Sequence, residues 1–547
     1  MARTAIFQRF IRLIAAVRPH DHAALSYVDR IETLAHLTHR SATQAATRRE
    51  FLRHTGAAGI ASLGLLSGAI GRAGAAPPPK AAIDVGIVGA GLAGLACADA
   101  LKQNGVTASL YEAAARAGGR CWSLRGFFPG QVAERGGELI DNLHKTMLRY
   151  AQRFGLAKED VNKVPGEIFY HFYGQRYPEA AVVTEFRDFV SAMRVDLNRL
   201  SPEVTATGHT PMDEVLDHTN LMAYLEGANG AQTPAGPLAK AAIIEAYEAE
   251  YGLAADEQSC LNFLLFIHAD RRSKFTPLGV FSDERYHLVN GNDGIVAGLA
   301  AELSGRIAYA ASLVRVRRTA AGRIELTLQE GNRTITKTHD IVVVTLPFSV
   351  LRDIELDANL NLPPEKLAAI RQLGYGTNAK MMVGFSSRPW LPLGGNGTSY
   401  ADLLNSQTTW ETNPTLATTT RGILTDYSSG PRGAGLNPNA VQTETQRFLT
   451  DLNLVYPGVL GAATRLGSRY LAHLEHWPSN QLAKGSYTCY KPGQFTTIAG
   501  LEGTPVGNLF FAGEHTNSFY EWQGFMEGAA LSGLQAARDI AAAVRSH

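Results

Sequence analysis

The chain has 547 residues, of which 45% are hydrophobic, and its 51 Lys and Arg nearly balance its 50 Asp and Glu. A formal charge of +1 offers no surplus of positive charge for a phosphate polymer, so the composition argues against nucleic acid as a partner. The apolar fraction lies far above that of a disordered chain and suffices for more than one folded core.

The cysteines carry little chemistry in this sequence. Cys97, Cys121, Cys260 and Cys489 form neither a CxxC pair nor the framework of a disulfide-rich domain. We predict four buried thiols, no cysteine-based zinc site and no metal site elsewhere.

Residues 1–75 are predicted to be a leader with a twin-arginine export signal. The sequence TRREFLR at 47–53 precedes an uncharged stretch at 55–70 and an Ala-Gly-Ala site at 73–75. That stretch is too short and too rich in Gly and Ala to span a membrane, and no later stretch in the mature chain is long and apolar enough. The expected partner of the precursor is therefore the twin-arginine machinery, which exports folded proteins to the periplasm or the medium. Residues 1–46 are either an extended leader or the product of an upstream start.

A dinucleotide-binding turn is predicted directly after the leader. Residues 83–88 are typical of a buried parallel strand and residues 95–101 of a helix. Between them lies a G-x-G-x-x-G sequence made of Gly89, Ala90, Gly91, Leu92, Ala93 and Gly94. This pattern arises by chance in a glycine-rich chain, but its place between a strand and a helix suits backbone contact with a pyrophosphate. Glu112 ends a second predicted strand at 107–111, where a carboxylate binds ribose hydroxyls and disfavours NADP.

The sequence RAGGR at 116–120 follows, and its Gly119 and Arg120 suit contact with a phosphate. G-x-G-x-x-G, a glutamate and R-x-G-G-R in this order resemble the flavin-dependent amine oxidase family, which includes monoamine, polyamine and L-amino-acid oxidases. The resemblance continues through ERGGE at 134–138, YHLVNG at 286–291, VVVTLP at 342–347 and the segment 509–528.

The resemblance implies a Rossmann-like FAD-binding domain and a set of cofactor-binding residues. Beyond those in the two motifs above, these are Gly136, Gly137, Glu138, Leu313, Trp477, Gly513, Glu514, Gly524, Phe525 and Met526. Ser486 stands where animal monoamine oxidases carry a flavin-linking cysteine, so we expect noncovalent FAD. A helix N-terminus within 509–528 would favour the negative charge of reduced flavin.

Four side chains are candidates for the chemistry: Lys380, Tyr487, Phe525 and Trp522. Lys380 lies in an apolar segment at 376–383, and a buried amine requires a partner. The resemblance implies that Lys380 reaches flavin N5 through a water and assists the reaction with oxygen. It also places Tyr487 and Phe525 on either side of the substrate amine, although the family usually has a tyrosine at the second position. Core packing is the alternative role for Trp522 and Trp477.

The substrate class is left between amines and L-amino acids. L-Amino-acid oxidases of the family commonly place a carboxylate-binding arginine after R-x-G-G-R, but residues 137–141 carry Glu138 and Asp141 instead. These acids either attract a second cationic end of the substrate or, for Glu138, only hydrogen-bond the flavin loop. Arg271, Arg272 or Arg285 would be the anchor in an amino-acid oxidase.

We therefore predict an α/β protein with a discontinuous FAD domain at 80–145, 277–345 and 455–547. A mixed helical and sheet substrate domain is predicted at 146–276 and 346–454, with a clear helix at 240–251. The expected reaction is oxidation of an amine by hydride transfer to flavin N5, hydrolysis of the imine to aldehyde and ammonia or amine, and reduction of O2 to H2O2. An L-amino-acid oxidase, a dehydrogenase or desaturase with another acceptor, and a noncatalytic flavin protein are the alternatives. A homodimer is compatible with the sequence.

Overall fold

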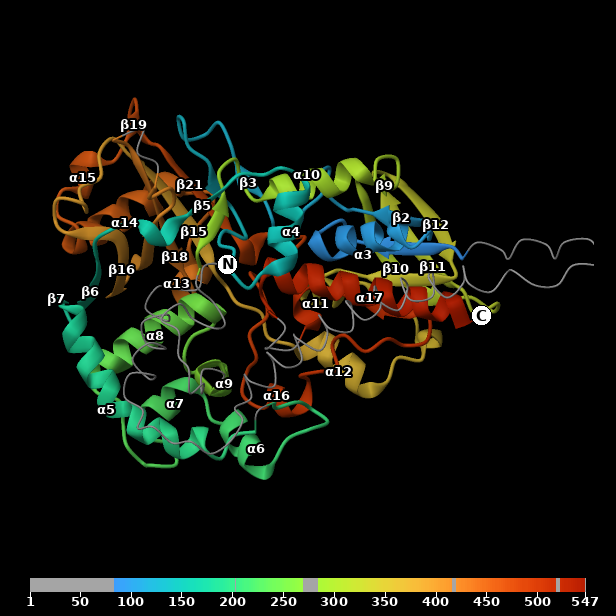
Figure 1. Ribbon diagram of the computed structural model, residues 1–547, viewed down its shortest axis with the longest axis horizontal. Coiled ribbons are helices and arrows are strands. Elements are labelled where there is room, and N and C mark those ends of the chain that lie inside the picture. The colour runs from blue at the N-terminus through green and yellow to red at the C-terminus, as the bar shows by residue number, and fades with distance from the viewer. Residues whose placement is uncertain (1–82, 202, 269–283, 416–419, 518–521, 547) are drawn as a thin grey trace, which may run out of the picture.

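The computed structural model describes residues 83–546 except residue 202 and the segments 269–283, 416–419 and 518–521 (Figure 1). The predicted leader with its twin-arginine motif lies outside these residues, as do Arg271 and Arg272. Among the helices described, none is both long and apolar enough to cross a bilayer.

A five-stranded parallel sheet forms the half of the molecule on the right of Figure 1. Its strands, in spatial order, are β22 (Leu509–Phe511), β13 (Ile341–Val344), β1 (Val85–Val88), β2 (Ala108–Tyr111) and β9 (Ile307–Ala308). Strands β1 and β13 are buried along their whole length, as their β-branched sequences predict. The covering helices α3 (Leu92–Gln103), α10 (Asp293–Glu302) and α17 (Met526–Ser546) pack together, with α3 in contact with both others.

An antiparallel sheet packs against this parallel sheet. It consists of β12 (Arg333–His339), β11 (Ile324–Glu330), β10 (Ala311–Arg318) and the short parallel strand β14 (Glu355–Leu356). A Cβ atom on Gly86 would lie 2.4 Å from the ring of His339, so the glycine allows the two sheets to approach closely. The hydroxyl of Tyr111 is hydrogen-bonded to the same imidazole at 3.0 Å.

A seven-stranded sheet builds the upper left of the molecule in Figure 1. Its strands are β21 (Ala472–His476), β15 (Ala379–Phe385), β18 (Gly422–Ser428), β17 (Ser406–Glu411), β16 (Gly395–Leu403), β6 (Glu167–Phe172) and β7 (Gln175–Tyr177). Every residue of β15 and β18 is buried. Helix α14 (Val441–Val455) contacts several of these strands and shares an apolar core with α15 (Val459–Ala462).

Helices form the lower left of Figure 1: α5 (Glu179–Leu197), α6 (Pro211–Asp217), α7 (Leu221–Leu225), α8 (Pro237–Tyr251) and α9 (Leu261–His268). The helix predicted at 240–251 is the C-terminal part of α8, which ends at Gly252 with a left-handed φ of 82°. Helix α8 also contacts β16 and β17, so it joins the helical layer to the seven-stranded sheet.

Shorter elements connect these layers. They are β3 (Ser123–Leu124), β4 (Ala133–Glu134), α4 (Lys145–Arg153), β5 (Lys158–Asp160), η1 (Val161–Lys163), β8 (Tyr286–Leu288), α11 (Phe348–Leu351), η2 (Ala358–Leu360), α12 (Pro364–Gln372), α13 (Gly430–Gly435), β19 (Arg465–Leu466), β20 (Arg469–Tyr470), η3 (Trp477–Ser479), α16 (Gln494–Thr497) and η4 (Glu514–Thr516).

The predicted fold class is confirmed, because a parallel sheet with a strand–turn–helix start stands beside a mixed helical and sheet region. The exact division into two discontinuous domains stays a prediction. Two elements have their contacts in the other predicted domain. Strand β21 lies in the segment 455–547 of the predicted FAD domain but pairs with β15 of the seven-stranded sheet. Helix α4 lies almost entirely in the predicted substrate domain but contacts α10 and α17.

Candidate active site

One cavity runs from the turn between β1 and α3 to the buried strand β15. Most of the residues predicted from the sequence line it: Gly89, Gly91, Leu92, Ala93, Glu112, Gly119, Arg120, Gly136, Gly137, Leu313, Lys380, Trp477, Tyr487, Gly513, Glu514, Gly524, Phe525 and Met526. Four predicted residues do not line it: Ala90, Gly94, Glu138 and Trp522.

The turn at 89–94 has the geometry of a phosphate cradle. Gly89 has a φ of 99°, which suits glycine, and Gly91 caps the N-terminus of α3. A Cβ atom on Gly91 would meet no atom within 4 Å, so the backbone is open to a ligand there. A Cβ atom on Gly94 would lie 2.0 Å from the carbonyl oxygen of Gly89, so this glycine keeps the helix close to the strand. The helix N-terminus therefore presents backbone N–H groups to an anion.

Glu112 lies at the end of β2 beside this turn. Its carboxylate accepts hydrogen bonds from the backbone N–H groups of Ala90 at 2.7 Å and Ala114 at 2.8 Å, and the residue is 8% exposed. The backbone N–H of Ala90 thus fixes the Glu112 carboxylate beside the cradle. The backbone N–H of Ala311, at the start of β10, donates to the carbonyl of Glu112 at 2.9 Å, and Leu313 of the same strand also lines the cavity.

The second glycine motif continues the cradle. Gly118 forms a parallel bridge with Gly91, and a Cβ atom on Gly119 would meet only the Cα atom of Gly91, at 3.8 Å. Arg120 donates hydrogen bonds to the carbonyl of Ser486 at 2.7 Å and to Glu514 at 2.8 Å. The carboxylate of Glu514 also accepts from the backbone N–H of Gly524 at 2.9 Å. This ion pair therefore joins the phosphate end to the loop that leads into α17.

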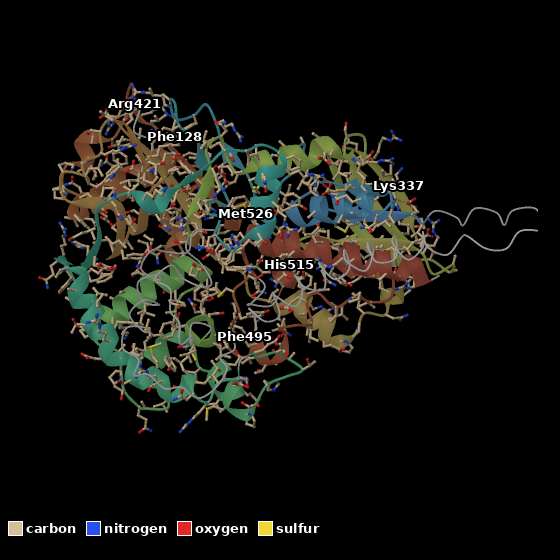
Figure 2. The ribbon with its side chains drawn as sticks, in the orientation of Figure 1. Phe128, Lys337, Arg421, Phe495, His515 and Met526 are labelled. Atoms are coloured by element: carbon tan, nitrogen blue, oxygen red, sulfur yellow. The ribbon has the colours of Figure 1, made fainter. Side chains whose placement is uncertain are left out.

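The loop at 135–138 forms part of the cavity wall, and its two glycines leave little room for a side chain. A Cβ atom on Gly136 would lie 1.7 Å from the carbonyl oxygen of Arg120, and one on Gly137 would lie 2.8 Å from Met526. Met526 begins α17 and lies near the middle of the molecule (Figure 2). Trp477 fixes the loop by donating its indole N–H to the carbonyl of Arg135 at 3.0 Å. Met526 and Trp477, which are far from residues 135–138 in the sequence, thus both pack against the backbone of this loop.

Lys380 lies in β15 with a side chain that is 1% exposed, and its amine is hydrogen-bonded to this loop and to Glu134, which precedes the loop. It donates to Glu138 at 2.6 Å, to the carbonyl of Gly136 at 2.8 Å and to that of Glu134 at 3.2 Å. Three acceptors match the three donors of an ammonium group. The sequence predicted that this buried amine needs a partner; the structure identifies the partner as Glu138.

Aromatic side chains enclose the cavity around Lys380. The hydroxyl of Tyr427, on β18, donates to that of Tyr487 at 3.2 Å, and Tyr487 donates to the carbonyl of Ala249 at 3.0 Å. Burial raises the pKa of both phenols, so both are neutral hydrogen-bond donors at physiological pH. Tyr427 had no distinguishing signal in the sequence, because its role depends on the neighbouring strand.

Phe525 also lines the cavity, and its ring contacts those of Trp522 and His144, which do not line it. The ring centroids of Phe525 and Trp522 lie 5.6 Å apart, and that of His144 lies 4.6 Å from Trp522 and 5.2 Å from Phe525. Trp522 has a φ of 66°, a conformation that a bulky residue adopts only where its surroundings fix it. Trp522 therefore positions Phe525 instead of lining the cavity itself.

The candidate substrate anchors are paired with protein groups. Asp141 is buried and accepts from the backbone N–H of Glu284 at 2.9 Å, while Arg285 pairs with Asp160 at 2.9 Å. Within the described residues, no group of three or more His, Cys, Asp or Glu side chains is arranged to hold a metal ion.

The fold and the cavity define a dinucleotide-binding α/β protein whose site ends in a buried lysine and aromatic rings. The sequence profile described as flavin containing amine oxidoreductase matches residues 92–541, and the chain belongs to this family. It is accordingly a flavin-dependent oxidoreductase.

Known proteins agree with this assignment. The chain is 23% identical over 474 residues to an L-amino-acid oxidase of Pseudechis australis, covering 83% of this chain and 86% of the relative. It is similar in fold to putrescine oxidase bound to putrescine, with a TM-score of 0.69, 20% identity and coverage of 84% and 99% of the two chains. Cyclohexylamine oxidase from Brevibacterium oxydans IH-35A gives a TM-score of 0.71, 21% identity and coverage of 85% and 99%.

Proposed function

We propose that this protein is an FAD-dependent amine oxidase. The amine is oxidised to an imine, which water hydrolyses to an aldehyde and ammonia or a smaller amine, and O2 is reduced to H2O2. The observation that carries this proposal is the single cavity that joins the phosphate cradle at Gly91 and Gly119 to Lys380, Tyr487 and Phe525.

The residues around the cavity fit FAD. Open backbone at Gly91 and Gly119 would hold the pyrophosphate, Glu112 the ribose, and Leu313 the adenine. The loop at 136–137 would lie under the ring system. We propose noncovalent binding, because the residue before Tyr487 is Ser486, whose hydroxyl donates to the side chain of Asn378. Bound FAD would accept the electrons from the substrate and pass them to oxygen.

The aromatic side chains would orient the substrate and exclude water. Tyr487, Tyr427 and Phe525 form apolar walls around the space beside Lys380. A dry, apolar site favours the neutral form of an amine over the ammonium form, which is the form that can be oxidised. No strong base is then needed, because the amine loses its proton before or during binding.

Lys380 would act in the oxygen reaction. Lys380 lines the cavity, and its amine is held in one position by three acceptors. A fixed positive charge stabilises the negative charge that develops when oxygen is reduced.

An L-amino-acid oxidase is the second candidate, favoured by the relatives that carry this name. It needs a cationic anchor for the substrate carboxylate. Arg285 is paired with Asp160, so an anchoring role would require that pair to open. This pairing argues against Arg285 alone, because Arg271 and Arg272, the other two candidate anchors, lie outside the described residues.

The decisive experiment is an anaerobic absorbance titration of the purified flavoprotein with primary amines, polyamines and L-amino acids in turn. Bleaching of the flavin band by amines, followed by recovery and H2O2 on admission of air, would support an amine oxidase. Bleaching by L-amino acids alone would replace it with the second candidate. Bleaching without oxygen consumption would identify a dehydrogenase or desaturase with another acceptor.

We also propose that the protein is exported in folded form to the periplasm or medium, on the basis of the twin-arginine pattern at Arg48 and Arg49. Fractionation of cells that express the wild type or an R48K/R49K variant tests this. We expect the variant precursor to remain in the cytoplasm and the wild-type protein to be exported.

A further inference from the structure

Lys380 reaches the cavity, but the group that balances its charge lies behind it. Lys380 is one of the residues that line the cavity, whereas Glu138 is not. Both side chains are 1% exposed, and their N–O distance is 2.6 Å. The pair is thus a buried ion pair of which the lysine, and not the glutamate, borders the cavity.

Hydrogen bonds hold both the carboxylate and the backbone of Glu138. One carboxylate oxygen accepts from Lys380, and the other accepts from the indole N–H of Trp410 at 2.9 Å. Its backbone carbonyl accepts from the side-chain amide of Asn292 at 2.5 Å, and the same amide donates to the carbonyl of Gly137 at 3.1 Å. Asn292 has no exposed surface, and its own N–H donates to Glu134 at 2.8 Å. The carboxylate therefore cannot move without breaking several buried hydrogen bonds.

We propose that Glu138 is a positioning residue for the oxidation chemistry: held by Trp410, it fixes the Lys380 amine beside the cavity and partly offsets its positive charge, and so sets the redox potential of the bound flavin and its reaction with oxygen. This inference rests on the proposed function only in that a flavin occupies the cavity. It needs no assumption about the substrate.

The physical reason is electrostatic. Reduced flavin carries negative charge, which an uncompensated ammonium in a dry site stabilises strongly, whereas an ion pair with its negative member a few ångströms behind stabilises it less. The Glu138 carboxylate therefore restrains the effect of Lys380. Trp410 contributes indirectly, since its N–H binds the second oxygen of Glu138 and so holds the carboxylate in place.

The test compares Glu138→Gln with a matched control, Glu411→Gln, in FAD-loaded protein. Glu411 is on the same strand as Trp410 and is also a buried carboxylate, paired with Arg388 at 2.7 Å and with the indole N–H of Trp390 at 2.8 Å. It does not line the cavity. The measurements are the midpoint potential of the flavin and the affinity for sulfite, which adds to flavin N5 to give an anionic adduct.

Glu138→Gln should raise the midpoint potential and tighten sulfite binding by about tenfold or more. Glu411→Gln should lower the melting temperature without changing either quantity. The double variant Glu138→Gln/Lys380→Met, which removes both charges, should return sulfite affinity close to the wild-type value. If Glu138→Gln leaves potential and sulfite affinity at the values of the control, the proposal is overturned.

Trp410→Phe provides a second route if Glu138→Gln retains no FAD. It removes only the indole donor, so sulfite affinity should rise by a smaller factor in the same direction. An unchanged sulfite affinity and potential in Trp410→Phe would then overturn the proposal. Neither the midpoint potential nor the sulfite affinity is measured with an amine. Unchanged values would therefore overturn only the role of Glu138, whereas a flavin that amines do not reduce would overturn the proposed function.

Discussion

The two ends of the cavity are built in different ways. The cofactor end is formed mainly by backbone from two short glycine motifs, at 89–94 and 116–120, that lie close together in the sequence. The lysine end is formed by side chains from separate strands, with Lys380 on β15 and Tyr427 on β18, and Lys380 is held by Glu138, which follows β4 and does not itself line the cavity.

This difference has a consequence for how each end responds to change. Backbone sites fail by steric exclusion, because an added methyl group either meets a neighbouring backbone atom, as at Gly94, or fills the space left open for the ligand, as at Gly91. Side-chain sites fail by loss of charge or hydrogen bonds, and the surrounding fold survives. Substitutions at the cofactor end should therefore remove FAD, whereas those at the lysine end should change rates.

The largest effect is expected for Gly94→Ala. The new Cβ atom would lie 2.0 Å from the carbonyl oxygen of Gly89, so α3 must move away from β1 and the cradle must open. We expect nearly complete loss of bound FAD in the purified protein, measured from the ratio of flavin to protein absorbance. Gly461→Ala is the control, because a Cβ atom there meets nothing within 4 Å. FAD content equal to that of the control would contradict the close packing of helix and strand.

Lys380→Met should leave FAD bound but slow reoxidation of the reduced flavin by about 10²–10³-fold, the usual cost of removing one preorganised charge. Stopped-flow mixing of the reduced protein with oxygen measures this rate. Lys366→Met is a matched control, because Lys366 is also buried but donates to the backbone of Leu501 and Glu502, away from the cavity. It should lose stability without slowing reoxidation. Unchanged oxygen kinetics in Lys380→Met would exclude the proposed role.

The lysine end should also have a pH-dependent contribution to stability. Burial raises the pKa of Glu134 to about 7 from a usual value of 4.5, against the opposing hydrogen bonds from Asn292 and Ser123. The folded protein thus holds this proton more tightly than the unfolded chain does. The free energy of unfolding should therefore fall by about 2–3 kcal/mol through this group as the pH rises from about 4.5 to 7.

Glu134→Gln isolates that contribution, because an amide does not titrate. Urea unfolding of both proteins at several pH values should show the difference between them growing up to about pH 7 and then remaining constant. A difference that does not vary with pH would mean that Glu134 is ionised at acidic pH in the folded protein.

The smallest effect is expected for Tyr427→Phe. The substitution removes one neutral hydrogen bond, to the hydroxyl of Tyr487 at 3.2 Å, which is worth about 1 kcal/mol. KM for the substrate should rise about fivefold with little change in kcat. Tyr456→Phe loses a similar bond, to the carbonyl of Thr398 at 2.8 Å, but lies outside the cavity and should leave KM unchanged. Equal KM values for both variants would show that Tyr427 does not shape the substrate space.

The cofactor end was largely predictable from sequence. Gly89, Gly91 and Glu112 lie where a strand–turn–helix unit must place them, because the motif and the structure it forms are contiguous. The lysine end was predictable only in part. A lysine inside an apolar segment requires a buried partner, but the sequence does not show that this partner is 242 residues away.

The sequence by itself determined the fold class, the dinucleotide turn and the residue types around the cavity, because these depend on local periodicity and on glycine at fixed spacings. Only the tertiary structure decided that Glu138 pairs with Lys380, that Trp410 and Asn292 hold Glu138 and its loop, and that Trp522 supports Phe525 from behind. The reason is that these contacts join elements brought together by sheet pairing and packing, and their geometry is set by the whole fold.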